Sequence, residues 1–363
     1  MAKSVAAVDK SSVRYGYTTS EQLSRRTPFQ KFLHNFKKNW QLHAMIALPL
    51  IYVILFSYLP MYGIQIAFRD YSAKVGITKS DWVGLQHFFT FFNKPEWTRY
   101  VKNTLTISLY SLAASFPIPI ILALFLHVNE HPTLKKITQN VSYIPHFIST
   151  VVMVGIINEV FKPYTGLIAS VTTKIYEGID AITKADGVVS GGFETFLDGI
   201  SKKLYLTTLK DVIMDPDLFY HLYVWSGVWQ GMGWSAIMYV AALAGVPLEL
   251  HEAAKIDGAS RWRRVLSVDL PAIMPTVCIL LILRFGSIMS VGHEKLYMMW
   301  LSGAPASKAE VISTYVYKQG IANANNYSFG SAVGLLNSVI NTSMVLLVNW
   351  ITNKLSDGES GLF

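Results

Sequence analysis

The chain is poor in charge and in cysteine. Of its 363 residues, only 15 % are Asp, Glu, Lys or Arg, whereas 52 % are hydrophobic. A soluble globular domain usually carries about 25 % charged residues, so the deficit argues against an ordinary soluble protein and favours one that spans a membrane. The single cysteine, Cys278, excludes an intrachain disulfide, and cysteine content therefore says nothing about the redox compartment.

Three further absences restrict the classes of function that the chain can have. No G-x-x-x-x-G-K-[ST] phosphate loop occurs, so the chain itself is not expected to hydrolyse ATP. The first 40 residues are polar and basic and contain no cleavable signal peptide, so the first apolar segment should be a retained membrane anchor. The net charge of +8 comes without a basic face interleaved with aromatic residues, which argues against nucleic acid as a partner. Basic cytoplasmic ends next to membrane lipids explain this charge more simply.

Long apolar segments recur along the chain. A helix needs about 20 apolar residues to cross about 30 Å of hydrocarbon. The third segment is the weakest, because it contains His146 and ends near Glu159. The pattern predicts an all-α, polytopic membrane protein with six transmembrane helices. The six segments lie roughly at 43–68, 103–127, 141–161, 219–245, 271–292 and 329–352.

The polar segments predict the arrangement around the membrane. Residues 1–41 should form a cytoplasmic tail with a basic amphipathic helix, which lies on the inner membrane surface or packs on other protein. Residues 42–354 form the membrane domain, and 355–363 a second tail. Lys and Arg are equally numerous on the two sides, but the inner segments carry fewer acids, so both termini are expected in the cytoplasm.

One outer segment, residues 162–218, is long for a loop. Two stretches with helical spacing, SVTTKIYEGIDAITKADG and FETFLDGISKKLYL, flank the breaker VVSGG. We expect two extracellular helices that serve either as a docking site for a partner or as a packing lid.

The stretch EAAKIDGASRWRRVLSVDLP, from Glu252 to Pro271, places a charged, glycine-broken turn between two apolar segments. Pro247 suits the start of a helix, and Gly258 permits the left-handed conformation that ends one. Ser260 can cap the next helix. The pattern predicts a helix–turn–helix along the cytoplasmic face over residues 246–270.

The spacing EAA, three residues, G, nine residues, I, any residue, LP is shared with a known family. Here Glu252-Ala253-Ala254, Gly258 and Leu270-Pro271 match it, and Val268 stands where isoleucine is usual. The chain therefore resembles the membrane subunits of bacterial binding-protein-dependent ABC importers. The segments AAKIDGAS, LPAIMPT, LILRFGS, VISTYVYKQG and AVGLLNSVIN resemble the branch that imports oligosaccharides and polysaccharide fragments. The resemblance covers roughly residues 28–354 and is interrupted at about 168–208, where this chain is longer.

The resemblance implies a type I ABC importer permease fold and a role for each motif residue. The motif helix would dock in a cleft of a separate ATPase subunit, where Glu252 accepts a charge-assisted hydrogen bond. Ala253 and Ala254 would permit close approach, Asp257 would add negative charge, and Gly258 would allow the turn. The alternative for Glu252 is a solvated surface acid.

The same resemblance implies the partners. The chain would be a permease subunit, not an enzyme, that moves oligosaccharide or polysaccharide fragments across the bacterial cytoplasmic membrane by alternating access. It would pair with a second, unlike permease subunit and work with two ATPase subunits and an extracellular solute-binding lipoprotein. No cofactor is expected in this chain, because ATP and Mg would be bound by the ATPase subunits.

Candidate residues of a substrate pathway lie on four segments, and Glu159 at the end of the third segment is one of them. Trp229, Gly231 and Trp234 resemble the sugar-contacting stretch of maltose-type permeases, although tryptophan near a span end is also typical of an interface anchor. A charge as deep in a span as Arg284 needs a partner or water. Its distance from the EAA motif matches the position of a sugar-contacting polar residue in maltose-type permeases, so the resemblance implies that Arg284 and Ser287 line the cavity.

An arginine at position 284 would suit an acidic sugar. The alternative is a structural arginine bonded to carbonyls or to Glu159. Asn337 and Asn341 share one helix face, where either the pathway or hydrogen bonds between helices would explain them.

Metal binding and enzymatic catalysis are the remaining classes. His146, His293 and Glu294 lack paired ligand spacing, and HEAAK lacks the second histidine of a zinc-protease helix, so we expect polar packing and no metal site. A membrane-embedded enzyme such as a glycosyltransferase, with Glu159 as base, is the alternative function. No pair of acids converges within the spans to support it.

Overall fold

The computed structural model describes residues 36–184, 199, 212–322 and 326–355. Within these residues the chain is helical, and its only β contact is an isolated bridge between Arg69 and Trp82. The all-α prediction is therefore confirmed. The chain divides into two units, Met1–Ile64 and Gln65–Phe363, and the functional residues discussed below belong to the second.

The helices differ widely in length. The N-terminal unit contains α3 (Trp40–Val53) and the π-helical η2 (Ile54–Tyr58), followed by the 3₁₀ helix η3 (Leu59–Phe68), which extends past the unit boundary. In the second unit the described helices are α4 (Gln86–Phe92), α5 (Trp97–Ser115), α6 (Pro117–Val128), α7 (Pro132–Tyr143), η4 (Ile144–Phe147), α8 (Thr150–Val160), α9 (Leu167–Lys184), α11 (Phe219–Ala244), α12 (Leu248–Ile256), α13 (Arg261–Arg264), η5 (Val265–Asp269), α14 (Leu270–Phe285), α15 (His293–Leu301), α16 (Ala306–Ala309), α17 (Ile312–Tyr317), η6 (Lys318–Ala322) and α18 (Tyr327–Leu355).

Four continuous helical stretches are long and apolar enough to cross a membrane. Two further stretches reach that length only as bent pairs, Pro132–Phe147 with Thr150–Val160 at 104° and Phe219–Ala244 with Leu248–Ile256 at 73°. By length and composition the described part of the chain thus holds four spans, or up to six. The four continuous stretches are Trp40–Phe68, Trp97–Val128, Arg261–Phe285 and Tyr327–Lys354.

The third predicted segment, residues 141–161, is a broken helix and not a straight one. Pro145 lies in η4, and the backbone turns extended at Ile148 before Ser149 caps α8 by accepting a hydrogen bond from the Val152 amide at 3.3 Å. The Ile148 carbonyl left free by this break accepts a hydrogen bond from Gln230 Nε2 on α11 at 2.8 Å. A proline and a cap therefore bend the chain where apolar periodicity alone predicted continuity.

The fifth predicted segment, residues 271–292, is also shorter than expected. Its helix α14 ends at Phe285, and a non-helical connection leads to α15. Asn341 of α18 holds this connection in place with two hydrogen bonds. Its Oδ1 accepts one from the Met289 amide at 3.0 Å, and its Nδ2 donates the other to Ser290 Oγ at 2.8 Å. Tertiary hydrogen bonds thus replace the last helical turns.

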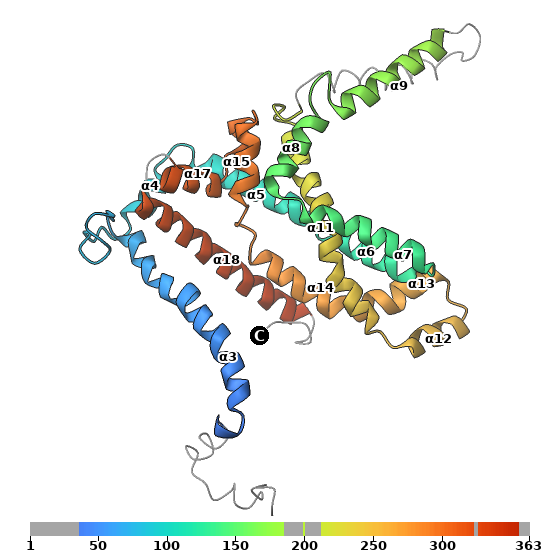
Figure 1. The fold of residues 1–363 in the computed structure, drawn as a ribbon, viewed down its shortest axis with the longest axis horizontal. Helices are drawn as coiled ribbons and strands as arrows, with labels where there is room; N and C mark the ends of the chain where they lie inside the picture. Colours follow the sequence, from blue (N-terminus) through green and yellow to red (C-terminus); the bar gives the residue numbers. More distant parts are fainter. Residues whose placement is uncertain (1–35, 185–198, 200–211, 323–325, 356–363) are drawn as a thin grey trace, which may run out of the picture. The chain divides into compact units, whose positions relative to one another are not determined.

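Helix α11 is the centre of the second unit and packs against α5, α6, α7 and α14, while α18 runs beside α14 (Figure 1). Buried side chains form three clusters. One joins α5, α8, α11 and α15 around Phe219 and Met299; one joins α4, α5, α17 and α18 around Phe91 and Tyr315; and one joins α6, α11 and α14 around Leu243. This packing holds the C-terminal end of α11 against the N-terminal end of α14. The helix–turn–helix described below connects these two ends.

Two predictions concern segments that are described only in part. The first expected outer helix is present as α9, whereas the second falls outside the described residues. The expected amphipathic helix of the N-terminal tail also lies almost wholly outside them.

Candidate functional site

The motif stretch folds as a helix–turn–helix, as predicted. Pro247 occupies the N-cap of α12, and Gly258 ends it with φ +73°, the left-handed conformation expected of it. Ser260 Oγ accepts a hydrogen bond from the Arg263 amide at 3.3 Å and caps α13. Gly258 and the Ser260 cap therefore set the angle between α12 and α13.

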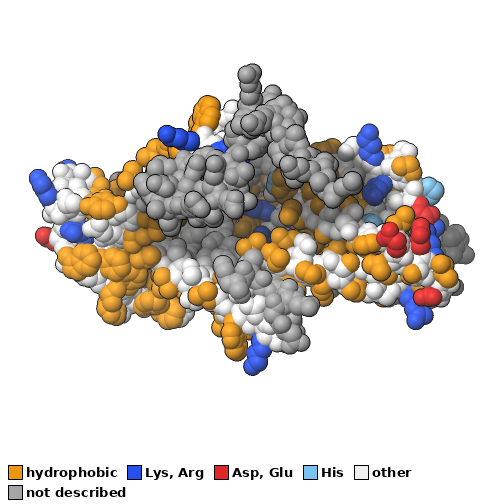
Figure 2. Space-filling view, turned by 90° about the horizontal axis from the view of Figure 1, so that it is seen from below, with side chains coloured by type: hydrophobic (Ala, Val, Ile, Leu, Met, Phe, Trp, Pro, Cys, Tyr) orange, Lys and Arg blue, Asp and Glu red, His pale blue; other side chains and the backbone are white. Residues whose placement is uncertain are grey.

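The motif residues present an open surface. Glu252, Ala253, Asp257 and Gly258 are exposed, and Ala254 is half-buried. Next to them Ile256 is 87 % exposed, unusually high for an isoleucine at a helix end. Acidic side chains gather at the right-hand end of the molecule in Figure 2, where α12 lies. Small, apolar and acidic side chains together make a surface suited to docking against another protein.

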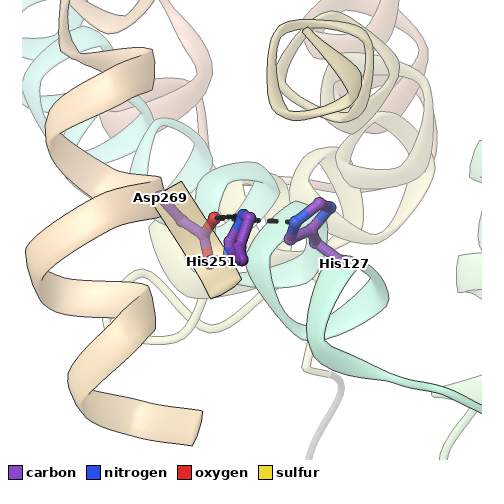
Figure 3. A group of neighbouring side chains, drawn as sticks. All are labelled: His127, His251 and Asp269. Carbon is purple, nitrogen blue, oxygen red and sulfur yellow. Dashed lines mark ion pairs between the residues drawn. The ribbon is translucent and has the colours of Figure 1, made fainter. Parts of the chain in front are cut away.

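Three residues hold α12 against its neighbours. Of these, only His251 was considered from the sequence, as the histidine of HEAAK, and no metal site was expected there. His251 Nε2 lies 3.2 Å from Asp269 Oδ1, and His127 Nε2 lies 3.5 Å from the same oxygen (Figure 3). They come from α12, η5 and the end of α6, so no spacing in the sequence pointed to them. An ion pair at the surface, between Arg261 of α13 and Glu130 of the connection between α6 and α7, 3.0 Å apart, lies on neighbouring elements.

Two cavities meet at Arg284. One, of about 180 Å³, is lined mainly by polar residues of α5 and of the connection after α14. The other, of about 370 Å³, lies between the α5–α6 junction, α11 and α14. Ser287 lines the first cavity, Gly231 and Trp234 line the second, and Arg284 lines both. The structure therefore brings together four of the predicted pathway residues from α11, α14 and the connection that follows α14.

The Arg284 guanidinium is only lightly held. Its Nη2 donates to Ser115 Oγ at 3.3 Å, and the side chain is exposed. In the described part of the chain no carboxylate forms an ion pair with it; Glu159 instead pairs with Lys162 at 3.5 Å on the surface of α8. An arginine free of an internal counter-ion can offer its charge and donors to a ligand.

Trp229 and Trp234 lie five residues apart on α11 and contact different parts of the structure. Trp234 stacks on His146, with ring centroids 4.5 Å apart and planes at 6°. Trp229 lines a third, almost entirely apolar cavity of about 520 Å³ beside α8. His146 thus makes the packing contact expected of it, and Trp229 lies apart from Gly231 and Trp234 because five helical positions turn it to another face.

The two asparagines of α18 also differ. Asn341 holds the connection that carries Ser290, a lining residue of the smaller cavity. Asn337 lies one turn earlier and is half-buried. Asn341 thus bonds to a non-helical connection, whereas the predicted alternative was hydrogen bonding between helices.

A half-buried lysine carried no signal in the sequence. Lys295 of α15 donates to the Tyr223 carbonyl at 3.0 Å and to Ser226 Oγ at 2.9 Å, and lies 4.7 Å from the centre of the Tyr223 ring. Burial lowers the pKa of Lys295 to about 8. Its position in a short, mixed helix carried no sequence signal.

Comparison with known proteins identifies the family. The family described as "Binding-protein-dependent transport system inner membrane component" matches residues 115–357. This chain belongs to that family. It is 36 % identical over 327 residues to Protein LplB of Bacillus subtilis (strain 168), covering 90 % of this chain and 92 % of that protein.

Two further relatives extend the comparison. The polygalacturonan/rhamnogalacturonan transport system permease protein YteP of the same organism is 35 % identical, covering 89 % of this chain and 90 % of that protein. A solved chain of a bacterial alginate ABC transporter, in complex with an alginate pentasaccharide-bound periplasmic protein, aligns with TM-score 0.71 and 30 % identity, over 91 % of this chain and 99 % of that one.

Family membership settles the class of function. The chain is a membrane-spanning permease subunit of an ABC importer with the permease fold, and it crosses the cytoplasmic membrane several times. It works with a solute-binding protein and is not itself an enzyme. The glycosyltransferase alternative finds no support.

Proposed function

We propose that this permease subunit imports acidic oligosaccharides or fragments of acidic polysaccharides by alternating access. The observation that carries the proposal is Arg284, which lines two adjoining cavities and has no internal carboxylate partner in the described residues. A carboxylated sugar could take both its charge and its paired donors. A structurally similar chain, 31 % identical in sequence, belongs to a bacterial ABC transporter involved in the import of the acidic polysaccharide alginate. This similarity supports an acidic substrate for the present chain.

The other pathway residues suit a sugar ring. An exposed face of Trp234 offers a flat apolar surface, and the open space at Gly231, where an added Cβ would meet nothing within 4 Å, lets a ring approach the backbone. Ser287 and Ser115 supply hydroxyl groups near the guanidinium. We place these residues in the pathway and leave Glu159 and Trp229 outside it.

The exposed motif surface supports a docking role for α12. In this proposal Glu252, Ala253, Ala254, Asp257 and Gly258 fit a cleft of an ATPase subunit, and closure of an ATPase pair moves α12 together with the spans. ATP and Mg are then bound by those two subunits. A second, unlike permease subunit completes the pathway, an extracellular lipoprotein delivers the sugar, and both termini of this chain lie in the cytoplasm.

The test uses the complete importer reconstituted in proteoliposomes with its binding protein. ATPase stimulation and uptake are measured with a uronate oligosaccharide and with a neutral oligosaccharide of equal length. Arg284→Gln, which keeps a donor for Ser115 but loses the charge, should lower uptake of the acidic sugar at least tenfold more than that of the neutral one. Arg284→Lys should retain part of the preference. Equal losses for both sugars would make Arg284 structural, and stimulation by neutral sugars alone would refute the acidic substrate.

A further inference from the structure

Two histidines and an aspartate converge where the motif helix α12 joins the membrane spans. His127 ends α6, His251 lies in the middle of α12, and Asp269 closes η5 immediately before α14 (Figure 3). One ligand atom from each residue lies within 4.8 Å of the other two. His127 thus meets two residues that follow it by more than 120 positions in the sequence.

Asp269 is the residue that needs explanation. Its side chain is only 2 % exposed, and its Oδ1 makes no hydrogen bond within the described part of the chain. His251 Nε2 is also buried without a hydrogen-bond partner there, although the two atoms are 3.2 Å apart. An ionised carboxylate away from water is costly unless it is paired or bound to a metal. The atoms approach without the alignment of a direct hydrogen bond, which is the arrangement that a shared cation would satisfy.

The distances fit such a cation. With zinc–nitrogen and zinc–oxygen bonds of about 2.0–2.1 Å, tetrahedral geometry puts ligand atoms roughly 3.3 Å apart. Asp269 Oδ1 lies 3.2 Å from His251 Nε2 and 3.5 Å from His127 Nε2. Two edges of the tetrahedron are therefore already present, and the third, between the two imidazoles, is at most 4.8 Å long.

We propose that His127, His251 and Asp269 form a binding site for a transition-metal dication of the zinc class, which fastens the motif helix to the ends of two spans. Imidazole and carboxylate together favour such ions, whereas Mg²⁺ and Ca²⁺ prefer sites built from oxygen alone. Three protein ligands leave a fourth position for water.

The proposal has a structural consequence that is independent of the transported sugar. Of the three ligands, one lies on α12 and two lie on the spans that flank it, so the ion would oppose separation of these elements. Binding to the folded chain alone raises its stability as metal is added. The site therefore predicts metal-dependent stability as well as metal binding.

The experiment uses the complete importer, purified with an affinity tag that contains no histidine and treated with a chelator. Zn²⁺ binding is measured by equilibrium dialysis, and Co²⁺ binding by its visible absorption. His127→Cys retains a zinc ligand, and His127→Ser has nearly the same size without one. His131→Ala, an exposed histidine four positions away, is the matched control. Each variant is first shown to co-purify with its partners.

The wild-type importer, His127→Cys and His131→Ala should bind one more Zn²⁺ per copy of this chain than His127→Ser, His251→Ala or Asp269→Asn. Their apparent melting temperature should rise by several degrees with Zn²⁺, and that of His127→Ser should not. Equal Zn²⁺ binding by wild type and His127→Ser would overturn the proposal, as would binding that survives in His251→Ala. Because uptake is not the readout, a failed sugar assignment would leave this result unaffected.

Discussion

Replacing Gly233 by alanine should force α11 away from α7. A Cβ added at Gly233 would collide with the carbonyl oxygen and the carbonyl carbon of Ser142 on α7. Real Cβ atoms essentially never come closer than 3.0 Å to a neighbour. Because the obstacle is backbone and not a flexible side chain, the two helices must separate locally by about 1 Å.

The cost follows from two opposing effects. Overpacking of a well-filled interior destabilises by about 1–3 kcal/mol, and a clash with backbone belongs at the upper end. Alanine recovers about 1 kcal/mol over glycine inside a helix. The net loss should be about 2 kcal/mol, which lowers the melting temperature by roughly 5 °C, given about 2–4 °C per kcal/mol for a large domain.

Gly231 supplies the control in the same helix. A Cβ added there meets nothing within 4 Å, so Gly231→Ala should be neutral or slightly stabilising. The assay follows intrinsic tryptophan fluorescence of the purified importer during heating. A melting temperature for Gly233→Ala equal to or above that of Gly231→Ala would refute the reasoning. Because Gly231 lines the larger cavity, its variant should reduce uptake while keeping stability.

Three further predictions concern the motif helix and the half-buried lysine. Glu252→Lys should leave the subunit in the membrane but abolish uptake coupled to ATP hydrolysis; normal uptake by this variant would contradict the docking role. Gly258→Ala should lose about 1–2 kcal/mol because φ +73° is strained for alanine, and Gly258→Asn should lose less; equal melting temperatures for the two variants would count against this. Lys295 has a pKa of about 8 in the folded chain and about 10.5 when unfolded, so the unfolded state binds more protons between these values and stability should rise with pH. Between pH 8 and 9.5, below the range in which tyrosine ionises, the free energy of unfolding should rise by about 1.5 kcal/mol. No such rise is expected in Lys295→Met. Thermal unfolding of both proteins across this pH range is the measurement.

The motif helix–turn–helix was predictable because its determinants are local. Pro247, Gly258 and Ser260 act through their own backbone angles and caps, which depend on neighbours in the sequence. The family assignment follows from the same stretch. Its docking role remains a prediction, since contact with another polypeptide lies outside the chain.

The breaks in the spans were less predictable. Apolar periodicity predicts that a segment can enter lipid, but hydropathy does not distinguish a straight helix from one bent by 104° between η4 and α8. Pro145 was a visible signal there. The end of α14 at Phe285 depends on Asn341, 56 residues later, whose hydrogen bonds replace helical ones.

The amino-acid sequence by itself therefore determines the class of protein. The long apolar segments require lipid, and the spacing of the motif places the chain among importer permeases. Which side chains meet was decided by packing alone. Arg284 faces two cavities, and His127, His251 and Asp269 converge, because helices distant in the sequence cross at those points. Local pattern carries no information about such crossings, since they depend on how several apolar faces are buried at once.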